Sequence, residues 1–432
     1  MSPDQGSRIR LSAILVVLAG LNLGGGFLMH GYVLARLGAG VETDALFAGM
    51  ALPQVMLAII ASSFMHVVVP LLAGSGDHEF RRDAWGFAAT TLAVFAPIAV
   101  VLAMLAPLWT PLVAPGLPAP GRPLLIEIAR IQLIGMVCTA LVGVLWAVHR
   151  AKHHFIWAES APVVSTILAW AFLLVMLPRW GVHAAAWAQV LRIGVNVALL
   201  APGLGRFPGF AGGLATATLA WRRLRPLMLG TAYGRVEPIV DRALSSLAAA
   251  GDLSLYYLCQ QVGAAALQVT HNALIAPIVP VLAAEAKDAR WTAFQATLRH
   301  RARIIVAATA TGFALLVLGG LAFGATAWGS ASAILPRAWW LIVGLGGVLV
   351  ATPLAESCRA AFYAMGQTAR PVRIDAAVFT LGLALKVAGF LAFGVWGMAL
   401  AASMHAIVSV LALRGGLRHA ITAGDGRSGR LS

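Results

Sequence analysis

The chain has 432 residues, of which 60% are hydrophobic and only 11% are charged, which is typical of a membrane protein and excludes an ordinary soluble domain. The formal net charge of +15 could indicate nucleic-acid binding. We nevertheless expect no nucleic acid among the partners, because Lys and Arg are generally enriched in the cytoplasmic loops of membrane proteins.

Apolar stretches of about 20 residues, the length that crosses a bilayer core, follow one another with short polar breaks. We predict twelve transmembrane helices over residues 11–36, 43–72, 84–113, 124–148, 155–178, 182–202, 225–250, 253–284, 297–324, 333–362, 371–393 and 395–413. The expected fold is all-α, with two pseudo-symmetric six-helix lobes at residues 1–202 and 225–413. A cytoplasmic linker, residues 203–224, joins the lobes, and residues 414–432 form a cytoplasmic tail.

Charge is distributed unequally between the two sides of these predicted helices. Lys and Arg concentrate on the side of the N-terminus, and the opposite segments hold only Arg36, Arg122, Arg179 and Arg337. This bias predicts that both termini are cytoplasmic in a bacterial inner membrane. The first apolar stretch is too long for a signal peptide, so we expect an uncleaved helix. Residues 285–303 predict an amphipathic surface helix with Trp291 and Phe294 on its apolar side.

A weak internal repeat relates residues 35–74 to residues 246–285. Both segments contain a small-residue turn, a Gln, a later His and a Pro near the end, which pair Gly40 with Gly251, Gln54 with Gln260 or Gln261, His66 with His271, and Pro70 with Pro280. Repeats of this kind are typical of transporters whose substrate binds near the membrane midplane, between the repeats. We therefore expect a substrate cavity between the two lobes.

Ionisable residues at membrane depth are costly and are functional candidates. Arg235, Glu237, Asp241 and Arg242 lie close together in a predicted transmembrane segment. Spacings of seven and four would place Arg235 and Arg242 on one helix face and the two carboxylates on a neighbouring face. The arginines could bind a diphosphate in a cavity; alternatively, the four charges neutralise one another. Pro226 and Pro238 predict a bent or broken helix.

Lys386 lies in the middle of a predicted transmembrane helix, too deep to reach the membrane surface. A buried Lys needs an anionic partner or loses its proton. We expect a buried pair between Asp241 and Lys386, which is either structurally fixed or titrates a proton.

Further polar residues are candidates for lining the cavity, namely His30, Gln54, Gln260, His271 and Arg192. The alternative is that they form hydrogen bonds that hold the helices together. Two pairs three residues apart, Glu356 with Arg359 and Glu127 with Arg130, are predicted to be local ion pairs.

Catalytic and metal-binding patterns are not evident in the sequence. Cys138, Cys259 and Cys358 lie in apolar stretches without CxxC spacing, which predicts neither a disulfide framework nor a metal site. His149 and His153 have metal-ligand spacing, but no carboxylate or Cys completes a site, so we predict a solvated basic loop. With no nucleophile–base arrangement, we expect a protein that is not an enzyme and has no cofactor.

Several sequence segments, in order along nearly the whole chain, resemble the lipid II flippase (MurJ/MviN) family within the MOP group of flippases and multidrug exporters. They are ARLGAG, TDALF, LP and VVVPLLA in residues 35–73, VAPGL at 113–117, LYYL at 255–258, IVPVLA at 278–283 and AAFYAMGQTARPVRI at 360–374. The resemblance implies a two-lobed flippase of lipid-linked saccharides. It also implies coupling to a sodium or proton gradient, in which the ammonium of Lys386 would be a tethered substitute for the cation. The family commonly adds two further helices, whereas this sequence predicts twelve.

Three positions depart from the family pattern. Met29-His30 stand where the family has an Arg-Asp pair, the segment at Gln54 lacks the family's Arg, and Gln260 stands where the family has another Arg. The resemblance implies that those arginines meet the pyrophosphate of the lipid carrier. Their replacement leaves the cargo open between a lipid II-like molecule and a polysaccharide precursor.

We therefore expect an inner-membrane flippase that moves an undecaprenyl-linked saccharide by alternating access. Its expected partners are a prenyl-diphosphate-linked glycolipid substrate, membrane lipids and envelope-biosynthesis proteins. One alternative is a cation-coupled multidrug or small-molecule exporter of the same fold, which would favour an acidic cavity. Others are a non-transporting scaffold in an envelope-biosynthesis complex and, with least support, an enzyme acting on lipid-linked sugars.

Overall fold

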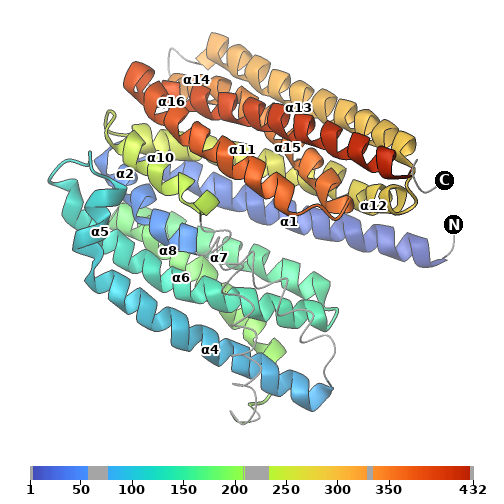
Figure 1. The fold of residues 1–432 in the computed structure, drawn as a ribbon. Coiled ribbons are helices and arrows are strands. Elements are labelled where there is room, and N and C mark those ends of the chain that lie inside the picture. Colours follow the sequence, from blue (N-terminus) through green and yellow to red (C-terminus); the bar gives the residue numbers. More distant parts are fainter. Residues whose placement is uncertain (1–2, 57–75, 208, 210–232, 328–333, 429–432) are drawn as a thin grey trace. The chain divides into compact units, whose positions relative to one another are not determined.

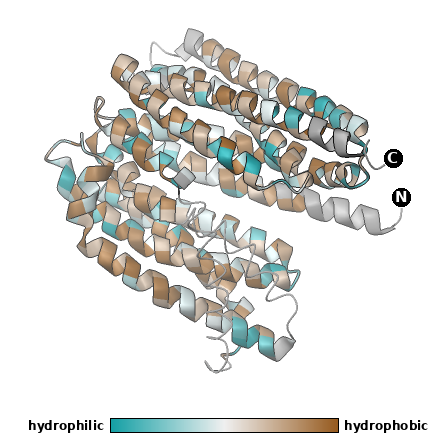
Figure 2. Ribbon diagram, viewed as in Figure 1, coloured by the Kyte–Doolittle hydropathy of each residue, from teal (hydrophilic) through white to brown (hydrophobic). Residues whose placement is uncertain are grey.

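The computed structural model describes residues 3–56, 76–207, 209, 233–327 and 334–428 (Figure 1). All regular elements in these ranges are helices, which confirms the predicted all-α class. Nine helices in the same ranges are long and apolar enough to cross a membrane. Figure 2 illustrates this for α4 (Asp77–Met104), which is hydrophobic over most of its length and hydrophilic at its N-terminal end. His66 and Pro70 of the predicted repeat, and residues 210–232, lie outside the described ranges.

The chain divides into two compact units, Met1–Ser254 and Leu255–Ser432. Besides α4, the first unit contains α1 (Pro3–Leu37), α2 (Val41–Gly49), α5 (Ala106–Val113), α6 (Gly121–Ala151), α7 (Phe155–Trp180), α8 (Val182–Leu200), the 3-10 turns η1 (Ala201–Leu204) and η2 (Tyr233–Arg235), and α10 (Glu237–Ser246). This division falls after α10, so α10 belongs to the first unit, whereas we had assigned it to the second lobe. The predicted lobe boundaries stay a prediction.

α6 is the central helix of the first unit and packs against α2, α4, α5 and α8. Its buried residues Leu133, Met136, Ala140 and Val144 recur every three or four positions, which puts them on one helix face. They form a core with apolar residues of α4 such as Phe87. Burial of this face holds the helices that carry the candidate site.

The predicted helix over residues 84–113 is interrupted at Leu105, between α4 and α5. Pro107 lies in the first turn of α5 and has no N–H to donate to the carbonyl of Ala103, four residues before it. The Nε of Arg130 on α6 donates to this carbonyl at 3.1 Å. The predicted Glu127–Arg130 ion pair is therefore wrong, because Arg130 satisfies the broken helix and Glu127 lies 3.0 Å from the Nε2 of His183.

The second unit contains helices with two interruptions. Its elements are α11 (Asp252–Thr270), which begins in the first unit, the π turn η3 (His271–Ile275), the 3-10 turn η4 (Ala276–Ile278), α12 (Val279–Lys287), α13 (Trp291–Ala327), α14 (Ile334–Gly344), α15 (Gly346–Ala364) and α16 (Ala369–Ser428). The break after α11 follows from Pro277 and Pro280, which cannot continue the α-helical hydrogen bonds. α16 kinks at Gly394, whose φ of +61° favours glycine, so the two last predicted helices are distinct.

Two predicted segments of the second unit differ from the structure. Residues 285–303 do not form a separate surface helix, because α13 begins at Trp291 and Phe294 is fully buried in the core with Ile278 and Leu282. The start of the predicted tail is also packed, since Leu417 and neighbouring apolar residues join the same core. In both segments the apolar side chains pack into this core.

Candidate functional site

The charged segment around Arg235 forms a broken helix, as its prolines predict. Tyr233–Arg235 make a 3-10 turn, and α10 begins at Glu237 with Pro238 in its first turn, where a missing N–H is tolerated. Arg235 therefore lies outside α10 and is exposed, whereas Arg242 is only 4% exposed. The prediction that the two arginines share a face of one helix is wrong, because the helix starts between them.

The guanidinium of Arg242 is bound by oxygen atoms of the protein itself. Its Nε donates to the carbonyl of Phe47 at 2.9 Å, and its Nη2 donates to Oε1 of Gln54 at 2.6 Å. Its Nη1 donates to the carbonyl of Pro238 at 3.1 Å. Each of these bonds is strengthened by the positive charge. Arg242 therefore attaches α10 to Phe47 on α2 and to Gln54 in the helical residues that follow α2.

His30 extends this arrangement to α1 and α8. The amide Nε2 of Gln189 on α8 donates to the ring Nε2 of His30 at 2.7 Å. The His30 ring also meets the ring of Phe47 edge-on, with centroids 5.5 Å apart. A chain of contacts, which we call the polar chain, therefore runs from Gln189 through His30, Phe47 and Arg242 to Gln54. It joins α8, α1, α2, α10 and the helical residues 51–56 of the first unit.

Arg192 lies beside the polar chain on α8. Its Nη1 is 3.1 Å from the position that a Cβ on Gly26 of α1 would occupy, so the guanidinium lies against the backbone of α1. The structure thus brings together four of the predicted cavity residues, namely His30, Gln54, Arg192 and Arg242. Sequence reasoning missed Gln189 and Phe47, although Gln189 could have been found from its position one turn before Arg192 in an apolar helix.

A second polar arrangement closes one end of the first unit. The carboxylate of Asp44 on α2 accepts hydrogen bonds from the backbone N–H groups of Gly251, at 2.6 Å, and Ser254, at 2.8 Å, at the start of α11. The hydroxyls of Thr43 and Ser254 lie 3.3 Å apart. Nearby, the N–H of Gly116 donates to the hydroxyl of Ser246 at 3.1 Å. We call this group of contacts the end clamp.

Comparisons with known proteins identify the fold and the family. A family model described as "Lipid II flippase MurJ" matches residues 33–428. The chain belongs to the lipid II flippase MurJ family. This family is one of flippases and not of enzymes, in agreement with the expectation from the sequence.

Solved structures of similar fold align with the chain over most of its length. A structure described as lipid II flippase MurJ in an inward closed conformation aligns with a TM-score of 0.76 and 14% identity, covering 94% of this chain and 87% of that one. An inward-facing multidrug resistance MATE family transporter of the MOP superfamily aligns with a TM-score of 0.72 and 14% identity, covering 96% and 99%. The MATE transporter VcmN of Vibrio cholerae, in its bent form, aligns with a TM-score of 0.60 and 17% identity, covering 97% and 99%. At these identities the structures establish the shared multi-pass membrane fold.

Other predicted site residues of this MurJ-family chain are described within their own units. Asp241 and Lys386 are both buried, with Lys386 only 1% exposed. Their pairing stays a prediction, because they belong to different compact units. Glu237 is half-buried in the first turn of α10, Gln260 is half-buried on α11, and His271 is exposed in the π turn.

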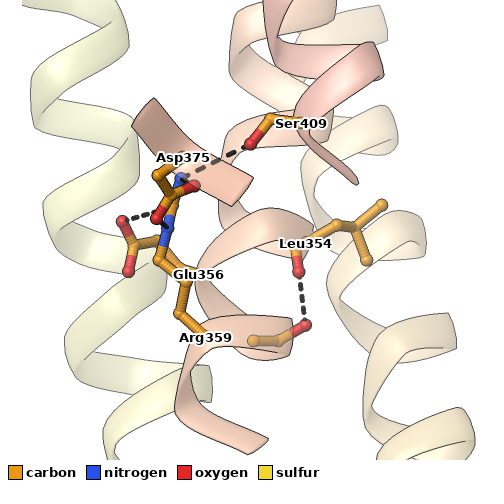
Figure 3. A network of polar contacts seen from close by, with 6 residues as sticks. Leu354, Glu356, Arg359, Asp375 and Ser409 are labelled. Atoms are coloured by element: carbon orange, nitrogen blue, oxygen red, sulfur yellow. Dashed lines mark hydrogen bonds and ion pairs between the residues drawn. The ribbon is translucent and has the colours of Figure 1, made fainter. Parts of the chain in front are cut away.

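The second unit contains a polar network centred on Arg359 of α15 (Figure 3). Nη1 of Arg359 lies 2.9 Å from the carboxylate of Glu356, which confirms the predicted pair. Nε and Nη2 also contact the two carboxylate oxygens of Asp375 at 2.8 and 2.9 Å, and Nη2 lies 3.4 Å from the hydroxyl of Ser409. The fork-shaped contact with Asp375 ties α15 to the part of α16 before its kink, and the contact with Ser409 reaches the part after the kink. Neither contact was predicted.

His149 does not lie in the solvated basic loop that the sequence predicts. It is 4% exposed, and its Nε2 lies 3.0 Å from the carbonyl of Leu200. Gly203 makes room for its ring, since a Cβ there would come within 2.5 Å of Nε2. In the part of the chain that the structure describes, no group of three or more His, Cys, Asp or Glu side chains could hold a metal ion.

Proposed function

We propose that the chain flips an undecaprenyl-linked saccharide, lipid II-like or a polysaccharide precursor, across a bacterial inner membrane by alternating access. The observation that carries the proposal is the polar chain, whose residues His30 and Gln189 lie in candidate membrane spans, in a member of the lipid II flippase MurJ family. Polar and charged side chains there are costly unless they face a protein interior or a substrate path. A glycolipid head group needs such a path, while its prenyl tail stays in the lipid.

The end clamp suggests how the path is closed on one side. α1 is the first helix of the chain, and α2, which carries Asp44, follows it directly. If the N-terminus is cytoplasmic and α1 crosses the membrane once, the end clamp lies on the outward side. Asp44 then caps the first turn of α11, where a negative charge is stabilised by the helix dipole. Outward opening would break this cap, and inward opening would leave it intact.

The buried residues Asp241 and Lys386 are the candidates for energy coupling in this proposal. A Lys ammonium next to Asp241 would take the place of a bound sodium ion, or would release a proton during the cycle. Flipping that depends on sodium and is unchanged in Lys386→Met would contradict a tethered-cation role. Flipping that follows a proton gradient and is lost in Lys386→Met would support proton coupling.

Reconstitution tests the proposed function. Vesicles containing the purified protein and a labelled undecaprenyl-diphosphate saccharide are assayed for movement of the head group between leaflets. We expect faster movement than in empty vesicles, and a decrease in Arg242→Ala because α10 loses its attachment to Gln54 and Phe47. Export of organic cations without movement of any prenyl-linked saccharide would favour the exporter alternative. No transport of either class would favour a scaffold in an envelope-biosynthesis complex.

A further inference from the structure

Polar residues of α1 and α8 face one another in an antiparallel register within the first unit. His30 contacts Gln189 at 2.7 Å, and Gly26, four residues earlier on α1, receives the guanidinium of Arg192, three residues later on α8. One further turn along both helices, the same register sets Asn22 of α1 at the level of Asn196 of α8. We call this row of positions the α1–α8 seam.

Neutral hydrogen bonds already connect α1 to its neighbours on both sides of Arg192. Gln189 and His30 link α8 to α1, and Thr166 of α7 donates to Oδ1 of Asn22 at 3.2 Å. Hydrogen bonds of this neutral kind suffice to join helices in a membrane. A permanent cation between them is costlier than another amide would be, which makes Arg192 a functional candidate.

Gly26 gives the guanidinium of Arg192 its place. Gly26 is buried, and a Cβ there would lie 3.1 Å from Nη1, closer than ordinary van der Waals contact. Gly24, half a turn away on the same helix, has open space where its Cβ would be. A Cβ at position 26 would shift the guanidinium of Arg192 by a few tenths of an ångström, and the branched side chain of a Val would displace it further, whereas a side chain at position 24 would meet open space.

Asn196 provides an acceptor next to this cation. Its Oδ1 is buried and has no hydrogen-bond partner in the described part of the chain. Arg192 and Asn196 are four residues apart, so their Cβ atoms are about 5–6 Å apart on one helix face. Arg192 supplies hydrogen-bond donors for an anion, and Asn196 supplies an acceptor for a hydroxyl group. The separation of the two side chains is about the width of one sugar ring.

We propose that the α1–α8 seam is a glycosyl-phosphate subsite, in which Arg192 binds a phosphate oxygen and Asn196 binds a hydroxyl of the attached sugar. This inference rests on the proposed function, because a prenyl-diphosphate-linked saccharide carries that group. It assigns recognition of the anion to α8, while Arg242 holds α10 in place.

The test measures binding of two probes to the purified full-length protein in detergent. Farnesyl diphosphoglucose carries the complete group, and farnesyl glucoside lacks both phosphates. We expect Arg192→Gln and Gly26→Val to raise the dissociation constant of the first probe at least tenfold and that of the second less than twofold. We expect Asn196→Ala to weaken both probes severalfold, because both contain the sugar hydroxyls.

The matched controls are Gly24→Val, at a position with open space, and Arg179→Gln, at an exposed arginine of α7. Both should leave the two dissociation constants unchanged. A loss below twofold for the first probe in Arg192→Gln, or an equal loss for both probes, would overturn the subsite. Displacement of the first probe by phosphatidylglycerol at equal concentration would also overturn it in favour of a general lipid-phosphate site. Gly26→Val keeps every polar group, so the test remains decisive if Arg192→Gln fails to fold.

The two proposals fail in different ways. Binding that depends on Arg192 without any movement of glycolipid in vesicles would refute the flippase and leave the subsite. Movement of glycolipid with unchanged probe binding in Arg192→Gln would refute the subsite and leave the flippase.

Discussion

Replacement of Asp44 by Ala tests the end clamp. The substitution removes the cap of α11, at about 1 kcal/mol, and leaves two buried N–H groups without acceptors, at about 1–3 kcal/mol each. Because these losses overlap, we expect the free energy of unfolding to fall by about 2–5 kcal/mol. The measurement is unfolding in mixed detergent micelles, followed by circular dichroism. Asp44→Asn retains one acceptor oxygen, so its effect should be intermediate.

Glu42→Ala is the control for this experiment, because Glu42 lies in the same turn of α2 but is exposed. Its effect should stay below about 0.5 kcal/mol, as for most surface substitutions. The same variants can be compared for cross-linking of cysteines placed at Thr43 and Ser254, whose hydroxyls are 3.3 Å apart. Asp44→Ala should lower the cross-linked fraction. Equal stability and equal cross-linking in Asp44→Ala and Glu42→Ala would refute the clamp.

Three further predictions concern a close backbone approach, an ion-pair network and the proposed buried pair. Gly116→Ala should destabilise the first unit by about 1–3 kcal/mol in the unfolding assay, because its methyl group would meet the backbone of Ser246 and Leu247, whereas Gly143→Ala, at a position with open space, should not. Arg359→Gln should lower the unfolding midpoint, because it leaves Asp375 and Glu356 without their cation. Asp375→Asn in the same chain should recover part of the loss. A double-mutant cycle should then show a coupling energy above about 0.5 kcal/mol. Lys386→Met should destabilise the chain more than Lys386→Met combined with Asp241→Asn if the buried pair exists, and additive effects would contradict that pair.

The helices could be predicted because apolar stretches of membrane length are a strong signal, and prolines marked several of their breaks. The sequence predicts an interruption near Pro238, but the residue at which α10 begins decides which arginine belongs to it. α10 begins at Glu237, so Arg235 lies outside the helix in which the sequence predicts it. The bond between Arg130 and the carbonyl of Ala103 was not foreseeable from residue spacing, because it compensates a break at Pro107 on another helix. Local pairs were predictable only where the partners were close in sequence, as with Glu356 and Arg359.

The sequence predicts which polar residues belong to the candidate site, but it does not predict which of them contact one another. His30, Gln54 and Arg242 were chosen because polar groups are rare in these helices, and all three lie in the polar chain. Their hydrogen-bond partners come from 159 and 188 residues away, which no local pattern encodes. The role of Gly26 is likewise not encoded locally, since it matters only when α8 brings Arg192 against it.

The sequence repeat explains why opening at the end clamp should be governed by α11. Pairing Gly40 with Gly251 makes Thr43 equivalent to Ser254, and these two residues meet in the clamp. The pairing sets Asp44 against Leu255, so the second repeat has no carboxylate with which to cap α2. α2 needs none, because Thr43 accepts the N–H of Gly40 within its own turn at 3.0 Å. Separation of the two helix starts would therefore cost stability at α11 alone, and we expect Asp44 to set the balance between closed and open states.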